Sequence, residues 1–246
     1  MATEREHFEI RTMLANARAA ALEADAEKSL AEAAKFKAET RGALATAKRG
    51  EIDLAVKLRS EKVELAKDKE FRVFVYDQVV TSQSAEKCIQ QLAEWSRVDP
   101  KCDIEIIFNS PGGEVVAGMA LFDYIQRIRK QGHAVTTTSF GMAASMAGIL
   151  LQAGDKRAMG PEAWLLIHEA SFGTHGSYGD VVDTVEWIKR VQDRILDIFA
   201  DRSAKADSKT ATKKLTRTQI KTRWHRKDWW ISSDEALKHG FIDEIA

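Results

Sequence analysis

Two regions with different hydrophobic patterns divide the chain near residue 70. Residues 1–70 contain no proline and only two glycines, Gly42 and Gly50, and they are rich in Ala, Glu, Lys and Arg, which are strong helix formers. Their small apolar side chains recur at helical spacing in one narrow stripe: Ala15, Ala19, Leu22, Ala26, Leu30, Ala33 and Phe36. This stripe predicts a charged, alanine-rich helical extension or weak coiled coil that packs on a second copy. A specific docking or scaffolding role for the extension is the alternative.

The rest of the chain has the pattern of a layered α/β domain spanning residues 71–246. Short apolar runs predict strands at residues 71–76, 104–108, 134–139 and 164–167. The segments between and after these runs predict helices at residues 84–96, 119–128, 142–153 and 178–202. Alternating strands and helices favour a sheet with parallel pairing, covered by helices.

A basic segment occupies residues 203–227. Its apolar positions Leu215, Ile220 and Trp224 have helical spacing, so a helix with a solvated basic face is expected. A phosphate-binding or nucleic-acid-binding surface is the alternative. The basic residues are Lys213, Lys214, Arg217, Lys221, Arg223, Arg226 and Lys227.

Composition and charge exclude several classes of protein. The 246 residues include 37 Lys and Arg against 37 Asp and Glu, so no net positive field favours nucleic acid. The hydrophobic fraction of 44% excludes a fully disordered chain. The first ten residues lack the apolar core of a signal peptide, and the longest apolar stretch, residues 140–151, is too short to span a bilayer. Two cysteines, Cys88 and Cys102, provide no disulfide framework, so we expect a soluble cytoplasmic protein without membrane or nucleic-acid partners.

A first glycine turn, residues 109–113 (Asn-Ser-Pro-Gly-Gly), follows the strand predicted at residues 104–108. Paired glycines let the backbone approach a ligand closely with its N–H groups pointing outward. The turn matches neither a dinucleotide-binding nor a Walker motif, so nucleotide binding is unsupported. A plain connection from strand to helix is the alternative interpretation.

A second small-residue segment, residues 141–148 (Gly-Met-Ala-Ala-Ser-Met-Ala-Gly), follows the strand predicted at residues 134–139. Its small side chains leave the hydroxyl of Ser145 accessible, and the N–H groups at the start of a helix would stabilise negative charge developing beside it. The segment is not the G-x-S-x-G elbow, because Ala143 stands where that motif has glycine. A small-residue helix packed on the sheet would have the same composition.

A serine nucleophile needs a base, and His168 is the candidate. It ends the apolar run 164–167, at the carboxyl end of a predicted strand, where α/β folds place their ligands. His175 lies in a Gly-rich loop, and a metal site formed with His168 would need a helix that Gly173 discourages. The orienting acid is less defined: Asp228 precedes a run of bulky apolar residues, but spacing alone would allow Asp183 or Asp193 equally.

Together these motifs resemble the Clp protease proteolytic subunit family over roughly residues 71–246. The segments that carry the resemblance, in their order along the chain, are residues 110–113 (SPGG), 141–146 (GMAASM), 166–168 (LIH), and 228–243 with its DWWIS and GFID sequences. The resemblance implies the α/β fold of ClpP-like and crotonase-like proteins, a stacked β-β-α superhelix, here with a long N-terminal helical extension.

The resemblance also implies roles for single residues. Ser145 would be the nucleophile, His168 the general base and Asp228 the orienting acid. The backbone N–H groups of Gly113 and Met146 would form the oxyanion hole, and no cofactor or metal is implied. An extended peptide would bind along the strand edge at Gly113, with substrate-binding positions at Gly112, Glu114, Val115 and Phe172.

The implied partners are protein or peptide substrates and further copies of the chain, arranged in a ring or double ring that meets through the helix of residues 178–202. Use of an ATP-dependent unfoldase is left open, because a charged helical segment of about seventy residues replaces the short apolar N-terminal loop of the family. The segment after His168 also lacks the usual Gln-Pro. Divergent relatives include bacteriophage head-maturation proteases, whose role in capsid assembly such an extension would suit.

Three other interpretations remain. The chain is a catalytically silent assembly subunit with the same fold, or a crotonase-like enzyme acting on an acyl thioester. Alternatively, it is a Ser–Lys peptidase in which Lys189 on the helix of residues 178–202 replaces His168 as the base.

Overall fold

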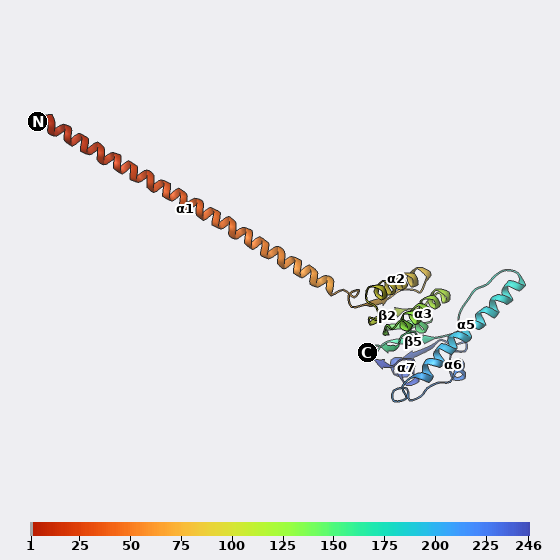
Figure 1. Cartoon of the computed structure of the whole chain (residues 1–246). Coiled ribbons are helices and arrows are strands. Elements are labelled where there is room, and N and C mark those ends of the chain that lie inside the picture. Colours follow the sequence, from red (N-terminus) through yellow and green to blue (C-terminus); the bar gives the residue numbers. More distant parts are fainter. Residues whose placement is uncertain (1) are drawn as a thin grey trace. The chain divides into compact units, whose positions relative to one another are not determined.

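The computed structural model describes residues 2–246, and Met1, the first residue of the predicted extension, lies outside the described residues. The chain divides into two compact units, one ending at Leu65 and one spanning Ala66–Ala246 (Figure 1). The first unit is a single helix, α1 (Ala2–Leu65), as its composition predicts. Residues 6–65 are all exposed, so α1 has no core of its own. Its packing on a second copy therefore stays a prediction.

The second unit is built on one mixed sheet of seven strands. Five strands lie in the order β1 (Val73–Tyr76), β2 (Ile104–Ser110), β3 (Val135–Ala144), β4 (Lys156–Met159) and β7 (Glu244–Ile245), each pair parallel. Two further strands continue from the second half of β3. β5 (Trp164–Ile167) pairs with it in parallel, and β6 (Trp229–Ser232) pairs with β5 in the antiparallel sense. The expected α/β fold with an N-terminal helical extension is confirmed.

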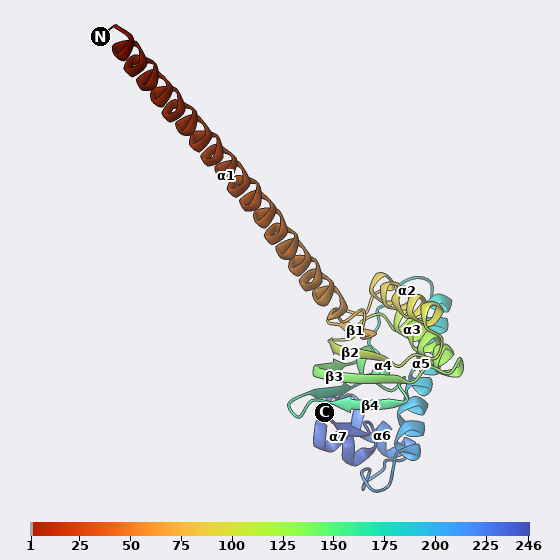
Figure 2. The ribbon, with the colours of Figure 1, turned by 60° about the vertical axis from the view of Figure 1, so that its left-hand side comes forward.

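Helices cover the sheet on the side where apolar side chains alternate inward. On β2, for example, Ile104, Ile106 and Phe108 are buried. Figure 2 shows β1 to β4 as neighbouring strands with the helices α3 (Val115–Lys130), α4 (Met146–Leu151) and α5 (Tyr178–Lys205) along one side. The remaining helices are α2 (Ser82–Val98), α6 (Arg217–Trp224) and α7 (Ser233–His239). Capping boxes at Thr81 and Ser177 fix where α2 and α5 begin.

The helix predicted over residues 142–153 is shorter than expected, because β3 continues to Ala144 and α4 begins only at Met146. Small residues such as Ala143 and Ala144 suit a helix or a crowded strand equally. Pairing of Met142, Ala143 and Ala144 with β5 decides for the strand. The candidate serine therefore lies at the junction between strand and helix.

The basic segment forms a short helix that is anchored on one side. Ile220 and Trp224 of α6 are buried, and Leu215 just before it is also buried. Arg217 pairs with Asp193 and Asp197 of α5, with nitrogen–oxygen distances of 2.7 and 2.6 Å. These ion pairs hold the start of α6 against α5.

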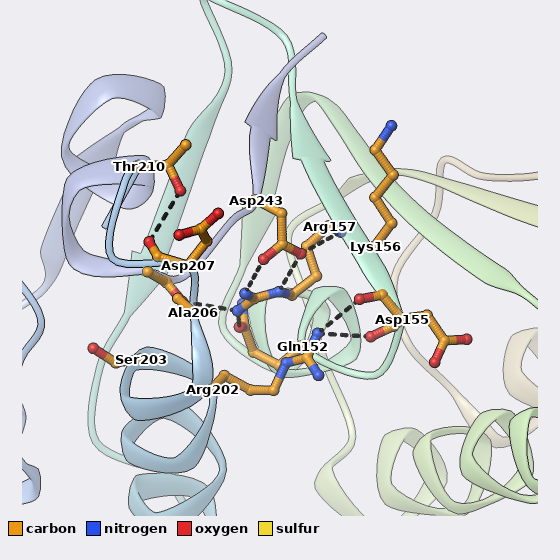
Figure 3. Close-up of polar contacts among 12 residues, drawn as sticks. Gln152, Asp155, Lys156, Arg157, Arg202, Ser203, Ala206, Asp207, Thr210 and Asp243 are labelled. Carbon is orange, nitrogen blue, oxygen red and sulfur yellow. Dashed lines mark hydrogen bonds and ion pairs between the residues drawn. The ribbon is translucent and has the colours of Figure 1, made fainter. Parts of the chain in front are cut away.

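A buried ion pair ties the C-terminal segment to β4 (Figure 3). The Arg157 side chain is 2% exposed, and its guanidinium donates to both carboxylate oxygens of Asp243, with Nη2 2.5 Å from Oδ1 and Nε 2.9 Å from Oδ2. Arg157 Nη1 also donates to Gln152 Oε1 and to the carbonyl oxygen of Gly240. Such a network compensates the cost of burying a charge and fixes the segment after α7.

No helix within residues 2–246 is both long enough and apolar enough to cross a membrane.

Candidate active site

Ser145 sits in a strained turn at the end of β3. Its backbone angles, φ 53° and ψ −122°, lie in a region that non-glycine residues rarely adopt. The turn is held because Ser145 N–H donates to the carbonyl oxygen of Leu166 at 3.0 Å, on the neighbouring strand β5. Strain of this kind clusters at functional sites.

His168 contacts the serine directly. It follows the last residue of β5, and its Nε2 lies 2.7 Å from Ser145 Oγ. Pairing of Ala144 with Leu166 brings the ends of β3 and β5 together. With its ring proton on Nδ1, His168 accepts the serine O–H hydrogen bond, which is the geometry of a nucleophile and its base.

Asp228 lies opposite His168 in the register of the sheet. The antiparallel ladder pairs Leu166 with Trp230 and Ile167 with Trp229, so the next positions along β5 and β6 are His168 and Asp228. Opposite residues of an antiparallel pair have their side chains on the same face. Both residues line one open cleft with Glu169, Arg226 and Lys227. Asp228 is exposed, and the hydrogen bonds of the described residues include none between it and His168.

The first glycine turn packs against the strained turn of Ser145. A Cβ atom on Gly112 would lie 2.5 Å from the carbonyl oxygen of Ala144 and 2.7 Å from Ser145 Cβ. Gly113 forms a bridge to Val80, and Met146 is the first residue of α4. Among the backbone hydrogen bonds of residues 2–246, none is donated by the N–H of Gly113 or Met146. Met146 directly follows Ser145 and Gly113 directly follows Gly112, so the oxyanion hole formed by these two N–H groups stays a prediction.

A small apolar cavity opens beside Ser145 and His168. Val115 and Met146, both named from the sequence, line it. The other apolar residues of its wall were not predicted from the sequence. Among them, Ile195 and Phe199 have the four-residue spacing of one helix face on α5. That spacing marks a buried face but does not reveal that the face borders a cavity. The remaining lining residues are Ile149, Ile167 and Ala170.

Two of the residues predicted to bind substrate, Glu114 and Phe172, do not line this cavity. The carboxylate of Glu114 accepts hydrogen bonds from the backbone N–H and the hydroxyl of Ser82, at 3.1 and 3.0 Å. It is thereby bound to the first residue of α2. Phe172 is 46% exposed and is not among the residues that line the cavity.

Among the hydrogen bonds of the described residues, none joins the Ser145 side chain to one of the alternatives left open by the sequence; its partner is His168. Lys189 on α5 is exposed, and so are Asp183 and His175. Asp193 is engaged with Arg217. Within residues 2–246, no group of three or more His, Cys, Asp or Glu side chains is placed to hold a metal ion.

The family model of the Clp protease matches residues 58–246 of the chain. The ATP-dependent Clp protease proteolytic subunit of Deinococcus radiodurans is 32% identical over 176 residues, which cover 71% of this chain and 79% of that protein. The subunit of the same name from Bacteroides fragilis is 35% identical over 159 residues, covering 63% and 69%. Subunit 2 of Tropheryma whipplei is 36% identical over 149 residues, covering 60% of this chain and 75% of that protein.

Proposed function

Because the chain belongs to the Clp protease family, we propose that it is a serine endopeptidase with Ser145 as nucleophile, His168 as general base and Asp228 as orienting acid. The observation that carries the proposal is the 2.7 Å contact between His168 Nε2 and Ser145 Oγ, at the ends of two paired strands. The register that sets Asp228 opposite His168 supports the third role.

In the proposed mechanism, His168 takes the hydroxyl proton as Ser145 Oγ attacks the peptide carbonyl carbon. The carbonyl oxygen becomes an oxyanion, which accepts hydrogen bonds from the N–H groups of Gly113 and Met146. His168 then gives the proton to the leaving amine, which leaves an acyl group on Ser145. In the second half of the reaction, His168 takes a proton from water as the water oxygen attacks the acyl carbon, and it returns the proton to Ser145 Oγ as the acid product leaves. Asp228 stabilises the imidazolium and the tautomer that leaves Nε2 free to accept.

The apolar cavity supports a substrate preference. It lies beside the nucleophile, and apart from Ser145 and His168 its lining is apolar. Burying an apolar side chain there is favourable, whereas an unpaired charge would be costly. We therefore expect the enzyme to cleave proteins or peptides next to a hydrophobic residue.

The relatives are named as ATP-dependent Clp protease proteolytic subunits, which supports an assembly of several copies acting with a Clp ATPase. A ring or double ring of this chain, joined through α5, is the arrangement we propose. The N-terminal half of α5 carries two large apolar side chains that are solvent-accessible in the single chain, Tyr178 at 87% and Trp187 at 45% exposure. Such side chains suit an interface between copies.

Labelling with a fluorophosphonate tests the proposed function. The probe should modify the full-length protein, and Ser145→Ala should abolish the labelling. Ser171→Ala is the matched control, because Ser171 is an exposed serine near His168, and it should leave labelling intact. An unlabelled wild type would favour the catalytically silent assembly subunit, and labelling that survives Ser145→Ala would exclude Ser145 as the nucleophile.

A further inference from the structure

A contact beside the proposed triad joins two segments that are far apart in the sequence. Glu169 directly follows the base His168, and its Oε1 lies 2.8 Å from Nδ1 of His225. His225 directly follows the last residue of α6 and lies three residues before Asp228. Neither residue has a part in the proposed chemistry. Glu169 also lines the cleft that His168 and Asp228 line, together with Arg226 and Lys227 of the turn after His225.

The segment from His225 to Asp228 is a tight turn that needs support. Arg226 has φ 51°, in the left-handed region that costs a non-glycine residue about 1 kcal/mol or more. One backbone hydrogen bond, from Lys227 N–H to the carbonyl oxygen of Trp224 at 3.1 Å, closes the turn. Asp228 is exposed, and the hydrogen bonds and ion pairs of the described residues include none made by its carboxylate. The turn itself therefore gives the carboxylate little restraint.

We propose that Glu169 is a positioning residue, which holds the turn through His225 and thereby keeps Asp228 opposite His168. The inference rests on the proposed function, because it concerns the orienting acid of that triad. Glu169 is adjacent to His168 in the chain, so a turn attached to Glu169 stays in register with the base. This hydrogen bond between Glu169 and His225 acts through Asp228 and does not touch the substrate.

The charge on Glu169 supports this contact. The hydrogen bond from His225 has the largest effect and lowers the pKa of the Glu169 carboxyl. Burial opposes it, and a hydrogen bond from the Arg226 backbone and the charge of Arg226 lower the pKa by smaller amounts. Glu169 is therefore a carboxylate at neutral pH. The Glu169 and His225 side chains are 31% and 61% exposed. A pair this exposed contributes little to overall stability.

Loss of the Glu169–His225 contact should affect the reaction rate more than the stability of the fold. Displacement of a reacting or orienting group by about 1 Å costs up to about 100-fold in rate, even where the fold is intact. Loss of Glu169 should therefore slow the chemistry and leave the unfolding midpoint unchanged. Substrate binding should also be unchanged, because neither Glu169 nor His225 lines the apolar cavity.

The test compares full-length Glu169→Ala, His225→Ala and the double variant with wild type. We expect a fall of about 3- to 30-fold in kcat and in the rate of fluorophosphonate labelling, with KM unchanged. The double variant should be no slower than the slower single variant, because both substitutions remove the same contact. Glu169→Gln should recover part of the rate, since its amide oxygen still accepts from His225.

The matched control is Glu94→Ala on α2, which removes an exposed partner of Lys69 from an ion pair and should keep the wild-type rate. A Glu169→Ala variant that reacts as fast as wild type, or faster, would overturn this inference. If Ser145 is still labelled in that case, the proposed function stands. A wild type that is not labelled at all would instead refute the proposed function, and the inference with it.

Discussion

His168 and Asp228 occupy the first positions beyond the paired residues of β5 and β6, directly opposite each other in the register set by Ile167 and Trp229. Ser145 likewise follows the last paired residue of β3, Ala144. Three neighbouring strands thus each present one residue of the proposed triad at the same edge of the sheet. Their proximity follows from backbone hydrogen bonding, which is insensitive to most side-chain changes.

Asp228→Asn should lower kcat/KM by about 100- to 10,000-fold, because the amide stabilises neither the required tautomer nor the imidazolium. Hydrolysis of a fluorogenic peptide with an apolar residue before the cleaved bond measures the effect. Asp234→Asn, at an exposed position in the first turn of α7, is the matched control and should remain active. Equal activity of the two variants would remove Asp228 from the triad.

Gly112→Ala should reduce labelling of Ser145 by about 100-fold or more, in the range seen when an oxyanion-hole donor is lost. The new Cβ would meet the carbonyl oxygen of Ala144 at 2.5 Å, and φ at this position is +89°. The turn would have to shift, and with it both the serine and the neighbouring N–H of Gly113. Gly173→Ala, whose Cβ would meet nothing within 4 Å, should label at the wild-type rate. Full labelling of Gly112→Ala would show that the turn tolerates displacement.

Asp243→Asn should lower the free energy of unfolding by about 3–5 kcal/mol, because it leaves the Arg157 guanidinium buried without its counter-charge. Glu244→Gln removes the adjacent carboxylate from an ion pair with Lys156 whose side chains are 53% and 45% exposed. That change should cost only about 0–1 kcal/mol. Urea unfolding at pH 7 measures both variants, and similar losses would contradict the role given to burial.

His239 should make the protein less stable as the pH falls below its ordinary pKa of 6.5. Burial lowers the pKa of His239 in the folded protein, so the unfolded chain binds a proton first as the pH falls. The stabilisation is complete above pH 6.5 and is lost as the pH falls through the folded pKa. Unfolding free energies measured between pH 5 and 8 should therefore vary less for His239→Gln than for wild type. His7→Gln, at an exposed position in α1, should follow the wild-type curve.

Local sequence pattern was sufficient where an element is defined by its own residues. The strand at residues 164–167 and the first residue of α5, Tyr178, agree with the prediction, because an apolar run defines the strand and Ser177 caps the helix. The sequence pattern did not predict elements whose structure depends on pairing with a distant segment. β4 and β6 have four residues each and acquire their structure by pairing with other strands, so they were not predicted.

The same limit applied to the site. Spacing left Asp183, Asp193 and Asp228 equivalent, and only the family resemblance favoured Asp228. The contact of Glu169 with His225 and the cavity wall from α5 join segments far apart in the sequence. The strained backbone of Ser145 also had no local signal, because its segment lacks the glycine of the usual elbow.

The placement of the three residues at the ends of paired strands implies that the loops between them are free to change in length. The segment between α5 and α6 can accommodate added residues without altering the spacing of the hydroxyl, imidazole and carboxylate, since ladder register and not loop length sets that spacing. Relatives that differ in these connections can therefore keep one chemistry while presenting different outer surfaces to substrates and partners.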